Sequence, residues 1–342
     1  MKRIKFKIEK LVLLIIIVMF VHIVIKGYDY AMAKIIKYEK YDYFEGYGTF
    51  DSPYLIENGE DLEKFSELVN SGNKYVGQYF RLTADIDMSG ISMNPIGKYE
   101  NGQYFFGTLD GNGHCISNLY INTGGYDGLF GKLGGTVINL GIESGFIGNL
   151  DFKGCCGAIA SNSVGSSARI INCFNKATVG GYRAGGIADN FLGSIINCWS
   201  DCELVGTEIG GITAYASSLG PQTFCYTTSV LTEDGSGHCF NCYTIKREEL
   251  YSNSMARRLS GNCLIWFETM TPVRMLNEWS FYDDELRLSS TRITYWNLFN
   301  FFVVVVLCIE YYTWISLIGL VLFMSIALNI CLKRARTKKI LS

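Results

Sequence analysis

The chain has 342 residues, enough for one long domain with additional segments at its ends. Glycine is frequent (37 residues), aromatic residues make up 14% of the chain and proline is rare (4 residues), which is typical of many short strands joined by tight turns. Residues 27–309 carry 19 Lys and Arg against 30 Asp and Glu, and this acidic balance excludes a nucleic-acid binder because phosphate contacts need clustered cations.

The first 33 residues have the features of an export signal. A basic start precedes an apolar run from Leu11 to Ile25, and Ala31-Met32-Ala33 resembles a signal-peptidase site. Residues 1–33 are therefore predicted to be either a cleaved signal peptide or a signal-anchor helix, and both alternatives place the following residues outside the cytoplasm. The stretch 34–45 is a predicted aromatic linker, suited either to stacking on sugar rings or to packing near the membrane.

An N-terminal module is predicted over residues 46–127, with a short helix inside it. Between Asp61 and Asn70, apolar side chains recur at helical spacing, which is typical of an amphipathic helix. Because the open ends of a repeat domain need to be covered, we expect this helix to cap the first coil.

The most concentrated polar residues of the chain also lie in this module. Asp85 and Asp87 alternate along one predicted strand, and Asp110 begins a turn that ends at His114. Carboxylates in such positions could bind Ca²⁺ or transfer protons, which makes these four residues a candidate polar site. The alternative is turn chemistry, because Asp-Gly and Asn-Gly pairs are strong turn formers.

Residues 128–245 repeat an Asn-Cys-aromatic motif. Its copies are Asn172-Cys173-Phe174, Asn197-Cys198-Trp199, Cys225-Tyr226 and Asn241-Cys242-Tyr243, preceded by Asn139-Leu140 without the cysteine. Each unit offers strands that are too short to bury a core alone. The repeat therefore predicts an all-β, parallel β-solenoid (a β-helix) in which stacked coils share one core.

The two constant positions of the repeat have predicted structural roles. Cysteine is small, apolar and often buried, so we expect an inward-facing ladder along the coils. Its members are Leu140, Cys173, Cys198, Cys225 and Cys242. Asparagine tolerates the left-handed backbone conformation of tight turns and is expected at the corners of the coils. These corner residues are Asn139, Asn172, Asn197 and Asn241.

Five of the cysteines outside this register are candidates for a disulfide. In an exported chain, a disulfide among them is the alternative to free thiols. They are Cys155, Cys156, Cys202, Cys239 and Cys263. No Cys-x-x-Cys pair comes with a matching second pair, so neither zinc nor another cofactor is predicted.

The motifs of residues 46–245, taken in order, resemble those of bacterial GLUG-motif surface proteins. The resemblance rests on 46–65, 79–87, 94–97, 106–114 and 116–121, on Gly128–Gly131 with Asn139–Gly141, and on the Asn-Cys-aromatic copies. It implies a right-handed parallel β-helix like the region found in bacterial adhesins and in IgA-protease-like surface proteins. The repeats are few and degenerate after residue 220, and no catalytic domain follows them, so protease activity is not implied.

The C-terminal part of the chain is predicted to return to the membrane. Residues 246–294 lose the glycine-rich pattern and are predicted to form a C-terminal cap and stalk, with a helix over Glu248–Leu259. Membrane segments are predicted over 295–332, where the uncharged run Ile315–Leu332 is long enough to span a bilayer core. The positive-inside rule places the basic tail 333–342 in the cytoplasm, which favours one span over a two-helix hairpin.

The leading interpretation is a membrane-anchored extracellular protein that adheres to an unknown glycan or protein and has no catalytic activity. Its other predicted partner is the lipid bilayer, through the terminal apolar helices. Two alternatives stay open. One is a polysaccharide-acting enzyme, which would need Asp189, Asp201 and Glu203 to converge on one coil face, and the other is a structural subunit of a cell-surface complex.

Overall fold

A computed structural model describes residues 43–98, 102–151, 153–215, 221–229, 239–240, 242–265 and 276–292. The predicted export signal, most of the aromatic linker, the membrane segments, the basic tail and Asn241 lie outside these residues. Among the residues described, no helix is long and apolar enough to cross a membrane. The residues up to Cys263, together with Leu276–Thr291, belong to one compact unit.

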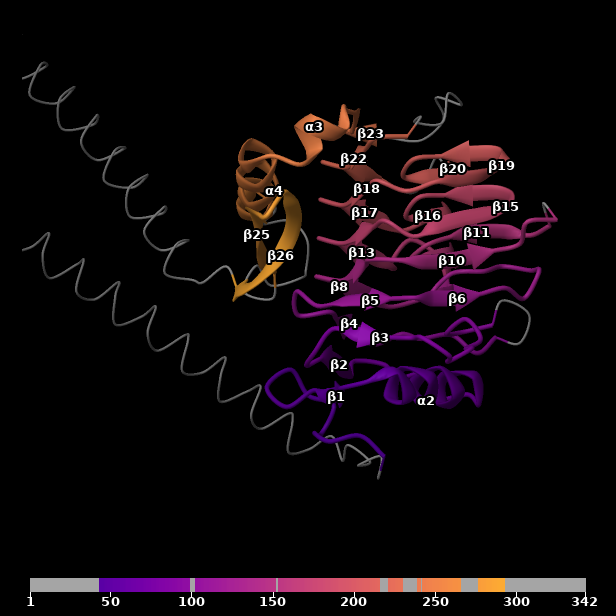
Figure 1. The fold of residues 1–342 in the computed structure, drawn as a ribbon. Helices are drawn as coiled ribbons and strands as arrows, with labels where there is room; N and C mark the ends of the chain where they lie inside the picture. Colours follow the sequence, from indigo (N-terminus) through magenta and orange to yellow (C-terminus); the bar gives the residue numbers. More distant parts are fainter. Residues whose placement is uncertain are drawn as a thin grey trace, which may run out of the picture. The chain divides into compact units, whose positions relative to one another are not determined.

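Four sheets of parallel strands wind into a solenoid, which confirms the predicted parallel β-solenoid (Figure 1). Sheet A consists of β1 (Tyr54–Ile56), β2 (Tyr79–Leu82), β4 (Thr108–Asp110), β8 (Thr136–Ile138), β13 (Arg169–Ile171), β17 (Ser194–Ile196), β21 (Gln222–Thr223) and β23 (Cys239–Phe240). Sheet B consists of β3 (Ile86–Asp87), β5 (Cys115–Ser117), β9 (Gly141–Ile142), β14 (Phe174–Asn175), β18 (Trp199–Ser200), β22 (Tyr226–Thr227) and β24 (Tyr243–Thr244).

The other two sheets close the coils on the opposite side. Sheet C consists of β7 (Phe130–Leu133), β12 (Ala160–Ser163), β16 (Ala188–Asn190) and β20 (Thr213–Tyr215). Sheet D consists of β6 (Leu119–Ile121), β10 (Gly145–Gly148), β11 (Cys155–Gly157), β15 (Thr178–Gly185) and β19 (Leu204–Gly210).

Register stacks equivalent apolar residues of successive coils into one core. In sheet A, Leu109, Val137, Ile170 and Ile195 are partners in adjacent strands, and all four are buried. A strand of two or three residues buries about one such side chain, so no coil is stable until its neighbours cover it.

Helix α2 (Gly59–Asn70) covers the first coil, where the sequence predicted a capping helix. Its N-terminus is closed by Asn58, whose side chain accepts from the backbone N–H of Asp61 at 3.0 Å. The ring of Phe65 is fully buried, with its centroid 4.3 Å from that of Phe80 and 5.1 Å from that of Phe105.

Asparagines at the corner between sheets A and B form a ladder of side-chain amides. Asn139, Asn172 and Asn197 have φ angles of 53, 60 and 54°, a region that asparagine tolerates. Nδ2 of Asn197 donates to Oδ1 of Asn172 over 2.9 Å, and Nδ2 of Asn172 donates to Oδ1 of Asn139 over 2.8 Å. Asp110 accepts from Asn139 at one end of the ladder (3.0 Å), and Asn262 donates to Asn197 at the other (3.1 Å).

The residue after each corner position of the repeat points into the core. Leu140, Cys173, Cys198 and Cys225 are fully buried, and Cys242 packs against the same core. Burial raises the pKa of the Cys198 and Cys225 thiols, so they stay protonated at neutral pH. The four cysteines of this ladder are free thiols.

The cysteines outside the register are also reduced where they are described. Cys155, Cys156 and Cys202 are free thiols. The side chains of Cys239 and Cys263 lie outside the described residues, so the disulfide alternative is excluded for three of the five.

Within the segment predicted as a cap and stalk, the structure describes two helices and a hairpin. After α3 (Arg247–Leu250), helix α4 (Asn253–Ile265) and the hairpin β25 (Asn277–Tyr282) and β26 (Glu285–Arg292) lie along the flank of the solenoid (Figure 1). We call these elements the flank segment. The solenoid offers this segment two sets of partners along the side of the coils: a column of outward aromatic side chains and the amide ladder.

Asn172→Gly should destabilise the protein by about 2–4 kcal/mol, because the substitution leaves several buried polar partners of the amide unsatisfied. Asn172→Ala should cost about 1 kcal/mol more, since alanine is strained at this φ angle whereas glycine is not. Urea unfolding of the two variants beside the parent measures both terms. Equal stability of the glycine variant and the parent would show that the ladder contributes nothing.

Candidate functional site

The four residues of the predicted polar site do not form one site. Asp85 accepts from the backbone N–H of Cys115 (2.9 Å), and its Oδ1 lies 3.2 Å from Nδ1 of His114. Asp87 instead closes a turn by accepting from the backbone and hydroxyl of Ser89, and it also accepts from Asn118. These hydrogen bonds lower the pKa of Asp87, which therefore stays ionised.

Asp110, the remaining member, is buried and belongs to the amide ladder. Its two oxygens accept from Asn139, from the backbone of Asn112 and from Nε of Arg81, which lies 3.2 Å away. Within the described part of the chain, no group of three or more His, Cys, Asp or Glu residues could hold a metal ion. Turn contacts are made by Asp87 with Ser89 and by Asp110 with Asn112, whereas the other contacts of these residues join neighbouring coils.

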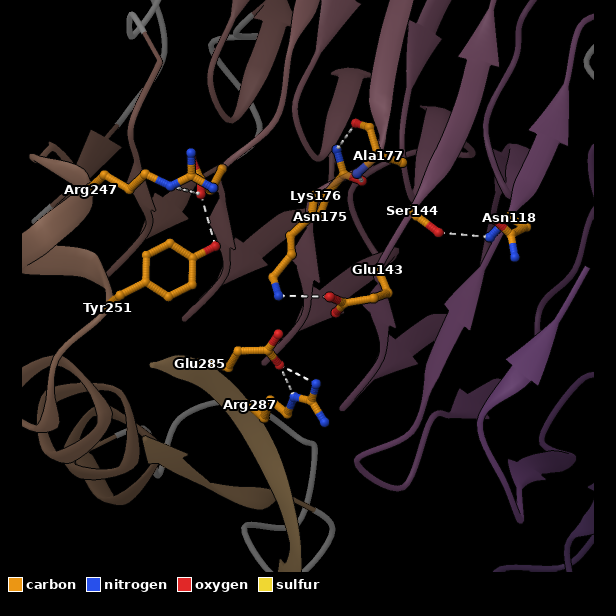
Figure 2. Close-up of polar contacts among 11 residues, drawn as sticks. Asn118, Glu143, Ser144, Asn175, Lys176, Ala177, Arg247, Tyr251, Glu285 and Arg287 are labelled. Atoms are coloured by element: carbon orange, nitrogen blue, oxygen red, sulfur yellow. Dashed lines mark hydrogen bonds and ion pairs between the residues drawn. The ribbon is translucent and has the colours of Figure 1, made fainter. Parts of the chain in front are cut away.

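The carboxylates that an enzyme would need are held on different sheets. Asp189 lies on β16 in sheet C, where it pairs with Arg183. Asp201 follows β18 in sheet B, and it accepts from Tyr251 (2.8 Å) and pairs with Arg247 (3.0 Å; Figure 2). The convergence that the polysaccharide-enzyme alternative requires is therefore absent for this pair.

The outer face of sheet B is covered by the flank segment. Phe174 and Trp199 of successive coils stack with centroids 4.6 Å apart and planes 5° apart, and Trp279 of β25 packs on both. At the edge of this contact, Lys176 forms an ion pair with Glu143 (2.8 Å) and lies beside the ring of Tyr251 (Figure 2). The third position of the repeat thus builds a second apolar core between the solenoid and the flank segment.

Sheet D and the adjoining strand β20 lie on the side away from the flank segment (Figure 1). Large side chains are exposed here on coil after coil. Tyr120 (50% exposed), Tyr182 (46%), Ile209 (36%) and Tyr215 (45%) belong to this surface. Phe146 continues it, with its centroid 6.1 Å from that of Tyr120. We call this surface the sheet D face.

A charged cluster interrupts the aromatic side chains of this face. Arg183 pairs with Asp189 across 2.8 Å, and its guanidinium lies 5.3 Å from the ring centroid of Tyr215. The hydroxyl of Tyr182 donates to Glu208 at 3.0 Å. Oδ1 of Asp189 and Nε of Arg183 are buried without a hydrogen-bond partner. Burial raises the pKa of Asp189 to about 6, although Arg183 opposes this shift.

This combination of groups suits a polyhydroxylated ligand. Tyrosine rings offer an apolar face for the C–H side of a sugar ring and a hydroxyl at its edge. Carboxylate and guanidinium groups beside them accept and donate hydrogen bonds to hydroxyl groups. Sequence reasoning missed the face because strands of such short length carry little periodicity. The signal available in the sequence was Tyr182-Arg183, a pair of large polar residues in a stretch rich in glycine.

Comparisons with known proteins identify relatives of part of the chain. No known family model matches it. A protein of Evansella cellulosilytica named "Putative Gly-rich membrane protein" is 35% identical over 125 residues, which cover 35% of this chain and 14% of the relative. Halomucin of Haloquadratum walsbyi is 36% identical over 159 residues, which cover 42% of this chain and 2% of halomucin. The chain therefore spans only a small part of the length of these relatives.

Among solved structures, a Bacteroides ovatus protein described as a putative immunoglobulin A1 protease is 20% identical to this chain, with a TM-score of 0.38. The match covers 72% of this chain and 95% of the other.

The raised pKa of Asp189 predicts how stability depends on pH. A carboxyl group whose pKa is higher in the folded than in the unfolded state binds extra protons only when folded, so its contribution falls as the pH rises toward about 6. Relative to Asp189→Asn, the parent should lose free energy of unfolding between pH 4 and pH 6 and change little above pH 7. Urea unfolding across this range would contradict the prediction if the parent gained stability relative to the variant.

Proposed function

We propose that the chain is a non-catalytic surface protein that binds a glycan through the sheet D face of its solenoid. The observation that carries the proposal is that one side of the coils is covered by the chain itself and the other side is exposed. The amide ladder and the aromatic column are covered by the chain's own flank segment, whereas Tyr120, Tyr182 and Tyr215 remain exposed.

Membrane anchoring is the second part of the proposal. It is supported by the apolar runs at 11–25 and 315–332, by the basic tail, and by the relative that is named a membrane protein. The solenoid then lies outside the cell as a right-handed β-helix of the GLUG-motif type, with its tail in the cytoplasm. Its acidic charge disfavours contact with anionic lipid, which leaves the sheet D face free for a ligand.

Glycan is preferred to protein as the ligand because the exposed side chains alternate between aromatic rings and hydrogen-bonding charges. A protein partner of useful affinity would need a wider surface with an apolar centre. Here the central groups are Glu208 and the partly exposed Arg183, which is held by the buried carboxylate of Asp189.

Replacing Tyr120 and Tyr182 together by alanine should weaken glycan binding by about 10- to 100-fold, since each stacking contact is worth about 0.5–1.5 kcal/mol beyond area burial. Glycan-array screening of the purified protein, followed by calorimetric titration of the best ligand, measures the loss. Tyr282→Ala is the matched control, because Tyr282 is 77% exposed on the hairpin, outside this face. An array on which the parent binds no glycan, or an unchanged affinity in the double variant, would contradict the proposal.

A further inference from the structure

A buried ion pair lies beside the exposed tyrosines of the sheet D face. Asp189 of β16 is fully buried, and its Oδ2 accepts from a guanidinium nitrogen of Arg183 at 2.8 Å. The other carboxylate oxygen, Oδ1, is buried without a hydrogen-bond partner, and so is Nε of Arg183. Burying charged groups with part of their hydrogen bonds unmade is costly, so the stability of the fold does not explain this pair.

The repeat does not require a charged pair at this position either. The register of sheet C makes Ser161 and Ala214 the equivalents of Asp189 on the two neighbouring coils. Both are buried and carry no charge. On sheet D, the partner of Arg183 in β19 is the anion Glu208, so the next coil does not repeat the cation. Asp189 therefore matches Arg183 and not the core of the solenoid.

The ion pair fixes Arg183 in place and cancels its charge. The guanidinium lies 5.3 Å from the ring centroid of Tyr215, and the side chain is 20% exposed, so a ligand on this face can contact it. A guanidinium has five N–H donors, and those at its exposed edge can donate to a ligand while others bind Asp189. Because the buried carboxylate balances the charge, these donors serve hydroxyl oxygens without attracting an anion.

The exposed charges around the pair are mainly negative. Glu208 lies on β19, where it accepts from the hydroxyl of Tyr182, and Glu203 precedes the same strand. Both glutamates are exposed, and among the described residues no ion pair engages either of them. Asp151 and Lys153 on the loop before β11 offset each other. The face thus combines aromatic rings and hydrogen-bond donors with a negative potential.

We propose that the sheet D face selects uncharged glycans and that Asp189 sets this selectivity by neutralising Arg183. The inference rests on the proposed glycan binding and adds the class of ligand to it. A sugar that carries a carboxylate or a sulfate group is repelled by Glu203 and Glu208 and finds Arg183 already neutralised. Asp189 is a positioning residue, because it acts through Arg183 and does not itself touch the ligand.

Protonation of Asp189 should weaken this selectivity. Burial raises the pKa of its carboxyl group to about 6, although Arg183 opposes the shift. The titratable and charged groups around it are Cys155 and Cys156 on β11, Arg183 on β15 and Glu208 on β19, with Tyr215 of β20 beside Arg183. Burial raises the pKa of both thiols, so they stay protonated at neutral and acidic pH. As the pH falls below about 6, the carboxyl group becomes neutral and the charge of Arg183 is no longer cancelled.

Matched pairs of glycans test the selectivity. An array carries neutral oligosaccharides, each beside the same oligosaccharide with one sulfate group, whose charge is constant between pH 5 and pH 7.5. The purified full chain is applied, and the affinity for both members of each bound pair is measured. At pH 7.5 the parent should bind the neutral member about tenfold more tightly, because a nearby like charge without a counterion partner disfavours the sulfate by about that factor.

Asp189→Asn keeps the shape of the side chain and removes its charge. This variant should bind the sulfated members about tenfold more tightly than the parent does at pH 7.5, so that the preference for neutral members is lost. The parent should change in the same direction at pH 5, which tests the inference even if the variant fails to fold. Asp283→Asn is the matched control: it removes the same charge from an exposed position of the hairpin and should leave the preference unchanged.

Equal or tighter binding of the sulfated members by the parent at pH 7.5 would overturn the selectivity while leaving glycan binding intact. A preference that persists both in Asp189→Asn and in the parent at pH 5 would overturn the role of Asp189. An array on which the parent binds neither member of any pair would overturn the proposed glycan binding, and this inference with it.

Discussion

A chain of buried side-chain amides at one corner of the coils is the interaction on which the rest of the described structure depends. Each amide of the ladder has two donors and two acceptor sites, and its neighbours in the ladder use only half of them. The flank segment supplies the remaining partners: Asn172 donates to the carbonyl of Asn277 and accepts from the ring N–H of Trp279. Solenoid and flank segment therefore complete one polar network, and each leaves buried polar groups unsatisfied without the other.

The same three-residue motif determines which face of the coils is covered by the flank segment and which face stays exposed. Its asparagine turns the corner, its cysteine or leucine fills the core, and its aromatic residue points outward to hold the flank segment. One long side of the coils is occupied by this packing. Exposed tyrosines and Arg183 consequently gather on sheet D and the adjoining strand β20, the face that the chain's own flank segment leaves uncovered and to which we assign the proposed ligand.

Much of the fold could be predicted because the repeat encodes it locally. The φ angles of Asn139, Asn172 and Asn197 and the burial of Cys173 and Cys198 follow from residue chemistry at fixed spacing. The position of the flank segment could not be predicted, since it depends on contacts between residues more than 60 positions apart, such as Asn197 with Asn262. The sheet D face escaped prediction for a related reason: its side chains become neighbours only when coils stack. Phe224 even replaces asparagine at a corner with φ of 55°, so the repeat position outweighs residue preference there.

Native-state hydrogen exchange tests most directly whether ladder and flank segment form one cooperative structure. Peptides from α4 and from β25–β26 would be compared with peptides from β13 to β18 in the full chain. The account predicts that the backbone amides of both sets open with the same free energy, because losing the flank segment also breaks the ladder. Exchange of the flank peptides more than tenfold faster than that of the coils, with the coils still fully protected, would contradict it.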